Sequence, residues 1–181
     1  MLPMTRAQRF AIVAAISVTI SAVRFAPLFA QAPASPAADA APATLIVGGD
    51  VATPLTLTPA DIKAMPRTTV NVREGDRQMR YDGVLAGELL RRAGAPVGRD
   101  LTGKAIATYV RVSAKDGYQV VFSIAELDPA FTANEIIVAD TVDGNALPNQ
   151  QGPLRLVAPH DSHASRWVRM LQRIEVVRLA K

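Results

Sequence analysis

The chain has 181 residues, 49% of them hydrophobic and 20% charged, a composition that is typical of a globular protein and excludes a chain that is disordered throughout. It contains no cysteine, so disulfides, cysteine nucleophiles and thiolate metal sites are excluded. The formal net charge is +4, but residues 31–181 carry 17 basic and 16 acidic side chains, which leaves no overall field that would attract nucleic acid.

The first thirty residues are typical of a signal peptide. Arg6 and Arg9 precede an apolar run from Phe10 to Val23, which is shorter than the about 20 residues that span a bilayer comfortably. Cleavage after Ala30 would release a periplasmic or secreted domain. If the segment is not cleaved, it is a membrane anchor, and the domain again lies outside the cytoplasm.

An Ala- and Pro-rich segment precedes the predicted domain. Ten of the thirteen residues in 31–43 are Ala or Pro, which predicts a linker, so the domain is expected to span residues 44–181. Short β-type runs at Thr44–Val47 and Leu55–Leu57 come first. A short helix follows, for which Thr58 is a good N-cap and which Pro66 ends.

A hairpin and an amphipathic helix are predicted next. Thr68–Arg73 alternates as a strand does, and Gln78–Tyr81 can return as its partner after a turn at Glu74-Gly75-Asp76. The apolar residues of Val84–Arg92 have helical spacing, and Gly94 is placed to end that helix.

The second half of the domain is predicted to be rich in short strands. Ser123 and Glu126 form the S-x-x-E pattern of a capping box. Asp161 or Ser162 can cap a single-turn helix at Ala164–Val168. The predicted strands are Ile106–Val112, Tyr118–Phe122, Ile136–Ala139, Leu154–Val157 and Arg173–Leu179. Without regular βαβ repeats, this order predicts an α+β domain with a mixed, mainly antiparallel sheet and short helices.

An ordered set of short phrases spans almost the whole predicted domain. The phrases are Tyr81-Asp82-Gly83-Val84, Glu88-Leu89-Leu90, Ala93-Gly94, Lys115-Asp116-Gly117-Tyr118, Phe122-Ser123, Ile137-Val138-Ala139, Asp143-Gly144, Gly152-Pro153-Leu154-Arg155-Leu156-Val157-Ala158-Pro159, Arg166-Trp167-Val168 and Ile174-Glu175-Val176. In their order and spacing, these phrases resemble the oxidoreductase molybdopterin-binding domain family, which has the sulfite-oxidase fold.

The chain departs from this family at one chemically important point. Enzymes that it resembles hold molybdenum through a cysteine thiolate, which would fall near Val70–Arg73, and this chain has no cysteine there or elsewhere. The resemblance thus implies the fold and leaves the cofactor unknown: a molybdopterin is implied by the resemblance alone, and bound molybdenum is not expected.

The loop from Pro159 to Trp167 is the most functional-looking stretch. In the family, a basic residue before Trp helps to bind the anionic pterin cofactor, and Arg166 matches it; hydroxyls and guanidinium groups suit phosphate. The alternative is a capped loop in which Trp167 fills the core. The resulting candidate binding residues are Tyr118, Arg155, His160, Ser162, His163, Ser165, Arg166 and Trp167.

No catalytic or metal-binding residue is assigned. The H-x-x-H spacing of His160 and His163 could bring two imidazoles to a metal, but a site needs at least a third ligand, for which Asp161 is the candidate. No nucleophile elbow accompanies Ser162 or Ser165. Tyr118 also fits a plain hairpin turn.

Three functions are compatible with these patterns. The first is an exported, non-catalytic or accessory domain that binds a small anionic ligand or an envelope protein partner in the ancestral cofactor cleft. The second is a periplasmic molybdopterin-dependent oxidoreductase, similar to sulfite oxidase, with atypical metal ligation. The third is a cell-envelope interaction module without a small-molecule site. Nucleic acid is not an expected partner, and a membrane is one only if the N-terminal segment stays uncleaved.

Overall fold

The structure is a computed structural model that describes residues 44–179, so the predicted signal peptide and linker lie outside the described residues. Within that range, no helix has the length and apolar character to cross a membrane. The elements are β1 (Leu45–Gly49), β2 (Leu55–Leu57), α1 (Pro59–Lys63), β3 (Thr68–Glu74), β4 (Arg77–Leu85), α2 (Ala86–Arg92), η1 (Gly98–Asp100), η2 (Gly103–Ala107), β5 (Thr108–Ala114), β6 (Gln119–Ser123), η3 (Ile124–Leu127), β7 (Ile137–Val142), β8 (Asn145–Ala146), β9 (Arg155–Val157), η4 (Ala164–Arg166) and β10 (Leu171–Arg178), where η denotes a 3₁₀ helix.

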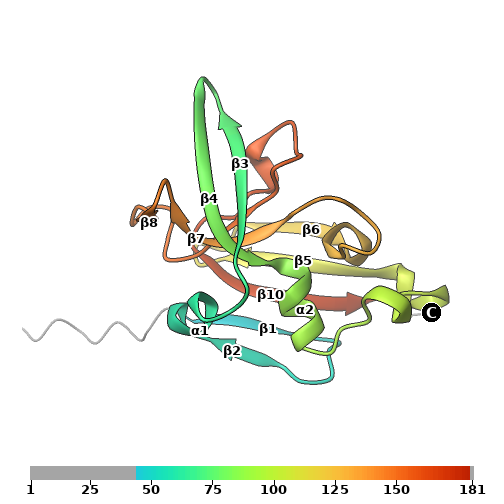
Figure 1. The fold of residues 1–181 in the computed structure, drawn as a ribbon. Helices are drawn as coiled ribbons and strands as arrows, with labels where there is room; N and C mark the ends of the chain where they lie inside the picture. Colours follow the sequence, from blue (N-terminus) through green and yellow to red (C-terminus); the bar gives the residue numbers. More distant parts are fainter. Residues whose placement is uncertain (1–43, 180–181) are drawn as a thin grey trace, which may run out of the picture. The chain divides into compact units, whose positions relative to one another are not determined.

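The strands form two sheets instead of one. Sheet A has the order β2-β1-β10-β5-β6, and sheet B has the order β3-β4-β7-β8, with β9 also paired to β7. Strands β1 and β10 run parallel, and the other pairs are antiparallel. The predicted α+β class with mainly antiparallel pairing is thus confirmed (Figure 1).

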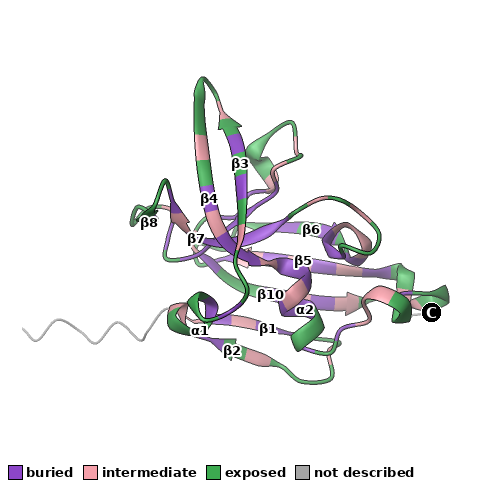
Figure 2. Cartoon of the chain, viewed as in Figure 1, coloured by how far each residue is buried: buried purple, intermediate pink, exposed green. Residues whose placement is uncertain are grey.

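The core lies against the inner face of sheet A and the adjoining part of sheet B. Burial alternates along β5, which is the pattern of a sheet with one face toward the core and one toward solvent. Helix α2 adds the fully buried Leu89 and Leu90. Figure 2 shows buried residues where the two sheets meet and exposed ones toward the tip of the β3–β4 hairpin.

The predicted hairpin is confirmed, and its second strand is longer than expected. Gly75 turns the chain with φ +60°, as the first central residue of a type II′ turn does. Val84 and Leu85, predicted to begin the helix, belong to β4 because they pair with Val138 and Ile137 of β7. Helix α2 then ends as predicted before Gly94, which has φ +71°.

Two other local predictions were wrong. Ile106 and Ala107 lie in the 3₁₀ helix η2, so the strand begins only at Thr108, where pairing with β10 starts. His163, not Asp161 or Ser162, precedes η4, and it makes no capping bond with its side chain; the Asp161 carboxylate binds Arg166 instead.

The N-caps predicted at Thr58 and Ser123 are confirmed, and each forms a capping box. The Thr58 hydroxyl accepts a hydrogen bond from the backbone N–H of Asp61, whose carboxylate accepts one from the N–H of Thr58. Ser123 and Glu126 make the same reciprocal pair at η3. Each pair satisfies two N–H groups that the first turn would otherwise leave without partners.

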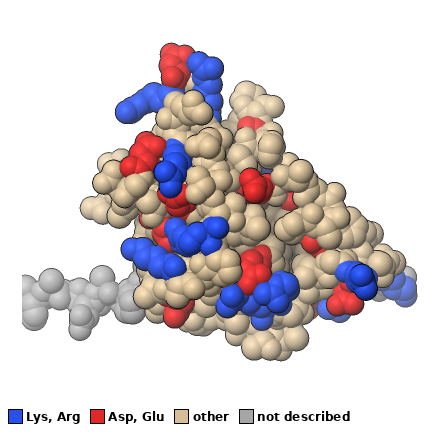
Figure 3. Space-filling view, in the orientation of Figure 1, with Lys and Arg blue, Asp and Glu red and all other residues tan. Residues whose placement is uncertain are grey.

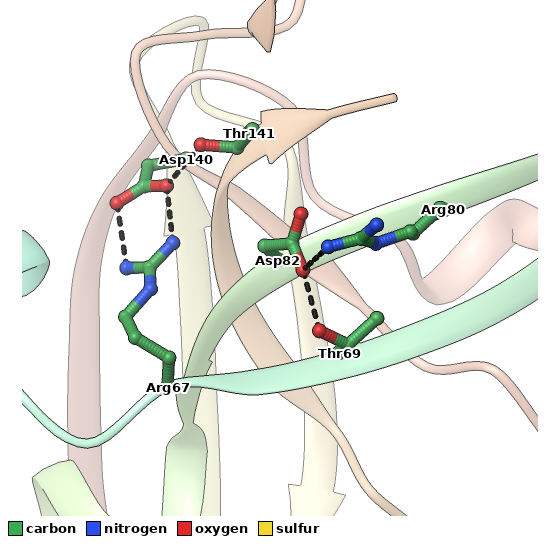
Figure 4. Close-up of polar contacts among 6 residues, drawn as sticks. All are labelled: Arg67, Thr69, Arg80, Asp82, Asp140 and Thr141. Carbon is green, nitrogen blue, oxygen red and sulfur yellow. Dashed lines mark hydrogen bonds and ion pairs between the residues drawn. The ribbon is translucent and has the colours of Figure 1, made fainter. Parts of the chain in front are cut away.

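A bidentate ion pair anchors the base of the hairpin. Arg67, just before β3, donates to both carboxylate oxygens of the buried Asp140 at 2.8 and 2.6 Å, and Thr141 donates to the same carboxylate (Figure 4). Burial raises the pKa of Asp140, but the hydrogen bonds from Arg67 and Thr141 outweigh it and hold that pKa below its ordinary value. On the neighbouring strands, Asp82 accepts bonds from Thr69 and Arg80.

The charges of the domain are mixed. Figure 3 shows basic and acidic side chains interspersed on the face drawn. Arg73, Arg77 and Arg80 of the hairpin are exposed, as expected for a solvated face.

Candidate ligand-binding site

A buried arginine lies beneath the predicted loop. Arg155, in β9, is only 4% exposed. Its Nη1 donates to the Tyr81 hydroxyl and to Gln151 Oε1, both at 2.6 Å, and its Nη2 lies 2.9 Å from Glu74 Oε1. Its Nε has no hydrogen-bond partner within the part of the chain that the structure describes. The guanidinium therefore joins β9 to the β3–β4 hairpin as an internal ion pair.

Two aromatic rings complete the surroundings of Arg155. The guanidinium carbon lies 5.0 Å from the Trp167 ring centroid and 5.3 Å from that of Tyr81, within the range of cation–π attraction. The two rings meet edge to face at 87°, and Trp167 Nε1 donates to the Ala158 carbonyl at 2.9 Å. Burial raises the pKa of Tyr81 to about 12, with Arg155 acting against that shift and Glu74 adding to it, so the phenol stays protonated.

Arg166 is held by two carboxylates. Its Nε and Nη2 donate to the two oxygens of Asp161 at 2.9 and 2.6 Å, and its Nη1 donates to Glu126 at 2.9 Å. Its guanidinium carbon lies 4.5 Å from the Phe122 ring centroid. The hydrogen bonds that Arg166 donates to Asp161 are the main cause of a rise in the pKa of Arg166, which burial opposes and Glu126 reinforces. This guanidinium joins the loop to η3 and lines neither of the two clefts described next.

Two clefts adjoin at Ala164 and Trp167. The first encloses about 460 Å³ and the second about 300 Å³. The first cleft is lined by Ala114, Asp116, Tyr118, Gln150, Ala164, Ser165, Trp167, Arg169 and Met170. The second cleft is lined by Arg73, Glu74, Gly75, Asp161, Ser162, His163, Ala164 and Trp167. The loop after β9 therefore forms a wall of both clefts.

The predicted site residues are divided between the first cleft, the second cleft and positions outside both. Tyr118, Ser165 and Trp167 line the first cleft, and the Tyr118 hydroxyl donates to the Ser165 carbonyl. Ser162 and His163 line the second cleft together with Trp167. His160 is exposed and lines neither, while Arg155 lies under Trp167 and Arg166 lies between its two carboxylates.

Sequence reasoning missed several cleft residues. Arg169 lines the first cleft, is exposed, and makes no ion pair with any acid among residues 44–179. Gln150 and Met170 lie beside it, and Glu74 enters the second cleft from the hairpin. The position of Arg169, two residues after Trp167 and two residues before β10, is the only signal that the sequence offered.

The described residues contain no metal centre. No group of three or more His, Cys, Asp or Glu side chains between residues 44 and 179 could hold a metal ion. In the segment where the resemblance would place a thiolate, Val70 and Val72 are buried in the core and Asn71 and Arg73 are exposed.

The comparisons with known proteins agree with the fold. A solved structure of the sulfane dehydrogenase SoxCD from Paracoccus pantotrophus is similar to this chain with a TM-score of 0.58 and 22% sequence identity, over 74% of this chain and 37% of that one. The likeness at this identity shows the fold alone, and the chain spans just over a third of that protein's length. A search of the curated proteins gave no match.

The family profile gives the assignment. The profile described as "Oxidoreductase molybdopterin binding domain" matches residues 32–180, which is most of the chain. With the two-sheet fold and the order of the phrases that carry the resemblance, this match leads to one conclusion: the chain belongs to the oxidoreductase molybdopterin binding domain family.

Proposed function

We propose that this domain is a non-redox member of its family that binds a small anionic ligand in the cleft beside Trp167. One observation carries the proposal: Arg169 faces that cleft without an acidic partner among the described residues, whereas Arg155 and Arg166 are both held by carboxylates. A guanidinium that keeps its donors free is the group that recognises carboxylate, phosphate or sulfate.

The other residues around Arg169 suit the same ligand. A volume of about 460 Å³ lies in the usual range for small-molecule sites, roughly 300–1,000 Å³. Ser165, Gln150 and Tyr118 supply hydroxyl and amide groups. The one lining carboxylate, that of Asp116, accepts a hydrogen bond at 3.0 Å from the backbone N–H of Tyr118, so it is engaged in its own turn.

A molybdenum centre does not fit the residues present. The chain has no thiolate, and the segment from Val70 to Arg73 offers only core valines, an amide and a guanidinium. Among residues 44–179, no group of three or more His, Cys, Asp or Glu side chains could hold a metal ion. The anion-binding role that the family resemblance implies for Arg166 would require breaking its bonds to Asp161 and Glu126. These residues support ligand binding without a redox step.

A nuclear magnetic resonance titration with inorganic phosphate tests this function. We expect the amide signals of Ala164–Met170 and Tyr118 to shift saturably, and we expect Arg169→Ala to weaken the apparent affinity at least about tenfold, because it removes a charge-assisted contact of 1.4 kcal/mol or more. Sulfate should shift the same amide signals if the site recognises the charge and the tetrahedral shape of the anion.

The matched control is Arg99→Ala, which removes an exposed arginine that makes no ion pair within residues 44–179 and lines no cleft described above. It should titrate like the native protein. If the two variants lose affinity equally, or if the shifts map to surfaces away from the first cleft, phosphate binds by general attraction and the proposed site is rejected.

We propose further that the domain acts outside the cytoplasm. The support is the sequence pattern alone, in which Arg6 and Arg9 precede the apolar run Phe10–Val23. The N-terminal sequence of protein recovered from the cell envelope should begin near Gln31, and elemental analysis of the same material should find no stoichiometric molybdenum. A cytoplasmic, full-length product would refute the export, and a bound metal would refute the non-redox assignment.

A further inference from the structure

A second arginine without an acidic partner lies in the neighbouring cleft. Arg73, near the end of β3, is exposed and makes no ion pair with any acid among residues 44–179. It lines the second cleft, as Arg169 lines the first. Asp76 lines a further hollow of the hairpin together with Arg73 but forms no ion pair with it. Each of the two clefts therefore has one guanidinium that is available to a ligand.

The carboxylates that line the two clefts are already engaged. In the second cleft, Glu74 Oε1 lies 2.9 Å from Nη2 of the buried Arg155, and both oxygens of Asp161 accept hydrogen bonds from Arg166. In the first cleft, Asp116 accepts a backbone N–H within its own turn. Because the acids of the second cleft are neutralised by arginines that line neither cleft, the charge that remains without a partner there is positive, like the exposed guanidinium of the first cleft.

The wall that the two clefts share is low and carries no charge. Only Ala164 and Trp167 line both clefts. Ala164 is exposed and its side chain is a single methyl group, whereas Trp167 is 6% exposed and is held by its hydrogen bond to the Ala158 carbonyl. The hairpin that carries Arg73 stands beside this loop (Figure 1). A ligand bound in the first cleft can therefore extend over Ala164 into the second.

We propose that the ligand of this domain is an elongated dianion, which places one anionic group at Arg169, the other at Arg73 and its middle over Ala164 and Trp167. This inference rests on the proposed function and adds to it the class of ligand. A guanidinium binds a carboxylate or a phosphate through two parallel N–H···O bonds, so each end of such a molecule meets a matching group. The apolar wall between the two arginines suits a hydrocarbon spacer.

The two fixed arginines make the length of the ligand decisive. Once one end is bound, the second end binds in an intramolecular step, whose gain is greatest when the spacer matches the distance between the two sites. A ligand that is too short reaches only one arginine, and a longer, flexible one loses part of the gain. Affinity should therefore pass through a maximum as the spacer is lengthened, whereas a single anion site would show no such maximum.

A series of straight-chain dicarboxylates tests this inference. Each is titrated into the full chain beside the monocarboxylate of the same length, and binding is followed by nuclear magnetic resonance. We expect one dicarboxylate to bind at least about tenfold more tightly than its monocarboxylate, a difference of about 1.4 kcal/mol. It should shift the amide signals of Arg73–Gly75 and Ser162–Ala164 together with those of the first cleft. Dicarboxylates that bind no better than monocarboxylates at every length would overturn the inference.

Two variants of the hairpin identify the second anion site. Arg73→Ala should bring the best dicarboxylate to within about twofold of its monocarboxylate, because only one guanidinium is left to bind it. The matched control is Arg77→Ala, which removes an exposed arginine of the same hairpin that makes no ion pair within residues 44–179 and lines neither cleft. It should keep the full difference. Equal losses in the two variants would show general attraction to the hairpin and overturn the inference.

Inorganic phosphate separates this inference from the proposed function. Phosphate is too small to bridge the two clefts, so its binding at Arg169 reports on the first cleft alone. If phosphate shifts the signals of the first cleft and the dicarboxylates show no preferred length, the ligand is a single anion: the proposed function stands and the dianion is rejected. If neither phosphate nor any dicarboxylate shifts those signals, both are rejected.

Discussion

Three arginines border Trp167 in space or in sequence, and their partners decide what each can do. Arg155 is buried against Glu74 and Tyr81, Arg166 is held by two carboxylates, and Arg169 faces a cleft. The sequence pointed to Arg166 because it precedes the tryptophan. Glu126 lies 40 residues away along the chain, so no local pattern could show that contact. Asp161 lies only five residues before Arg166, but the sequence had assigned it to capping the helix instead.

Trp167→Ala should destabilise the domain by about 3–5 kcal/mol, because it removes a large buried ring and leaves a cavity. The ring is 6% exposed and packs on Tyr81 and on the Arg155 guanidinium, so its loss also uncovers a buried cation. Urea denaturation followed by circular dichroism measures the change. Trp167→Phe, which keeps an aromatic ring and loses the bond to Ala158, should cost clearly less; equal losses would place the stabilisation in the hydrogen bond instead.

The elements were most predictable where the chemistry is local. The hairpin turn at Gly75, the N-cap at Thr58, the capping box at Ser123 and the helix end at Gly94 each depend on residues within a few positions of one another, and all were found from the sequence. Val84 and Leu85 were misassigned because their apolar spacing also suits a helix, whereas their pairing with β7 depends on residues more than fifty positions later.

Gly83 marks the point where β4 passes closest to β7. A Cβ atom there would lie 2.3 Å from the Val138 carbonyl oxygen and 2.7 Å from the Ala139 Cα, both on the backbone and unable to yield cheaply. Gly83→Ala should therefore destabilise the domain by about 2 kcal/mol or more, since the two strands must separate.

The matched control for this change is Gly48→Ala, in β1, where a Cβ atom would meet nothing within 4 Å. Alanine there should be neutral or stabilise by about 0.5–1 kcal/mol, because it restricts the unfolded chain. Thermal melts of both variants distinguish steric conflict from a general effect of losing glycine. A Gly83→Ala protein with native stability would show that β4 and β7 have room to move apart.

At the scale of the whole molecule, the sequence predicted the class of fold but not its division into two sheets. Short alternating runs indicate strands, and they carry no information on which strands meet. The parallel pairing of β1 with β10 joins residues more than a hundred positions apart, and β9 pairs with β7 across a long loop. The candidate site was found only in part for the same reason. The loop from Pro159 to Trp167 is one continuous segment that the sequence could single out, whereas Arg73 and Glu74, which line the second cleft opposite it, lie far earlier in the chain.

Acid should weaken the fold as a whole, and the direction follows from the carboxylates. Burial raises the pKa of Asp140, but hydrogen bonds from Arg67 and Thr141 bring it below its ordinary value. Burial likewise raises the pKa of Glu126, and hydrogen bonds from Arg166 and the Ser123 backbone bring that pKa below its ordinary value. Such groups bind fewer protons in the folded state than in the unfolded chain. Their contribution is therefore fully present above the unfolded pKa values of about 4, and it is lost as pH falls through the folded values.

Arg67→Met isolates one part of this acid dependence. The variant should lose about 1–3 kcal/mol of unfolding free energy at pH 7, because Asp140 stays buried without its partner. As pH falls through the folded-state pKa of Asp140, which lies below its ordinary value, the two proteins should converge. Arg80→Ala, which removes an exposed ion pair with Asp82, should change stability by less than about 1 kcal/mol throughout this pH range. Urea denaturation at a series of pH values measures the unfolding free energy of each protein. If the difference between Arg67→Met and the native protein stays constant as the pH is lowered to 2, the Arg67–Asp140 pair is not the source of the acid sensitivity.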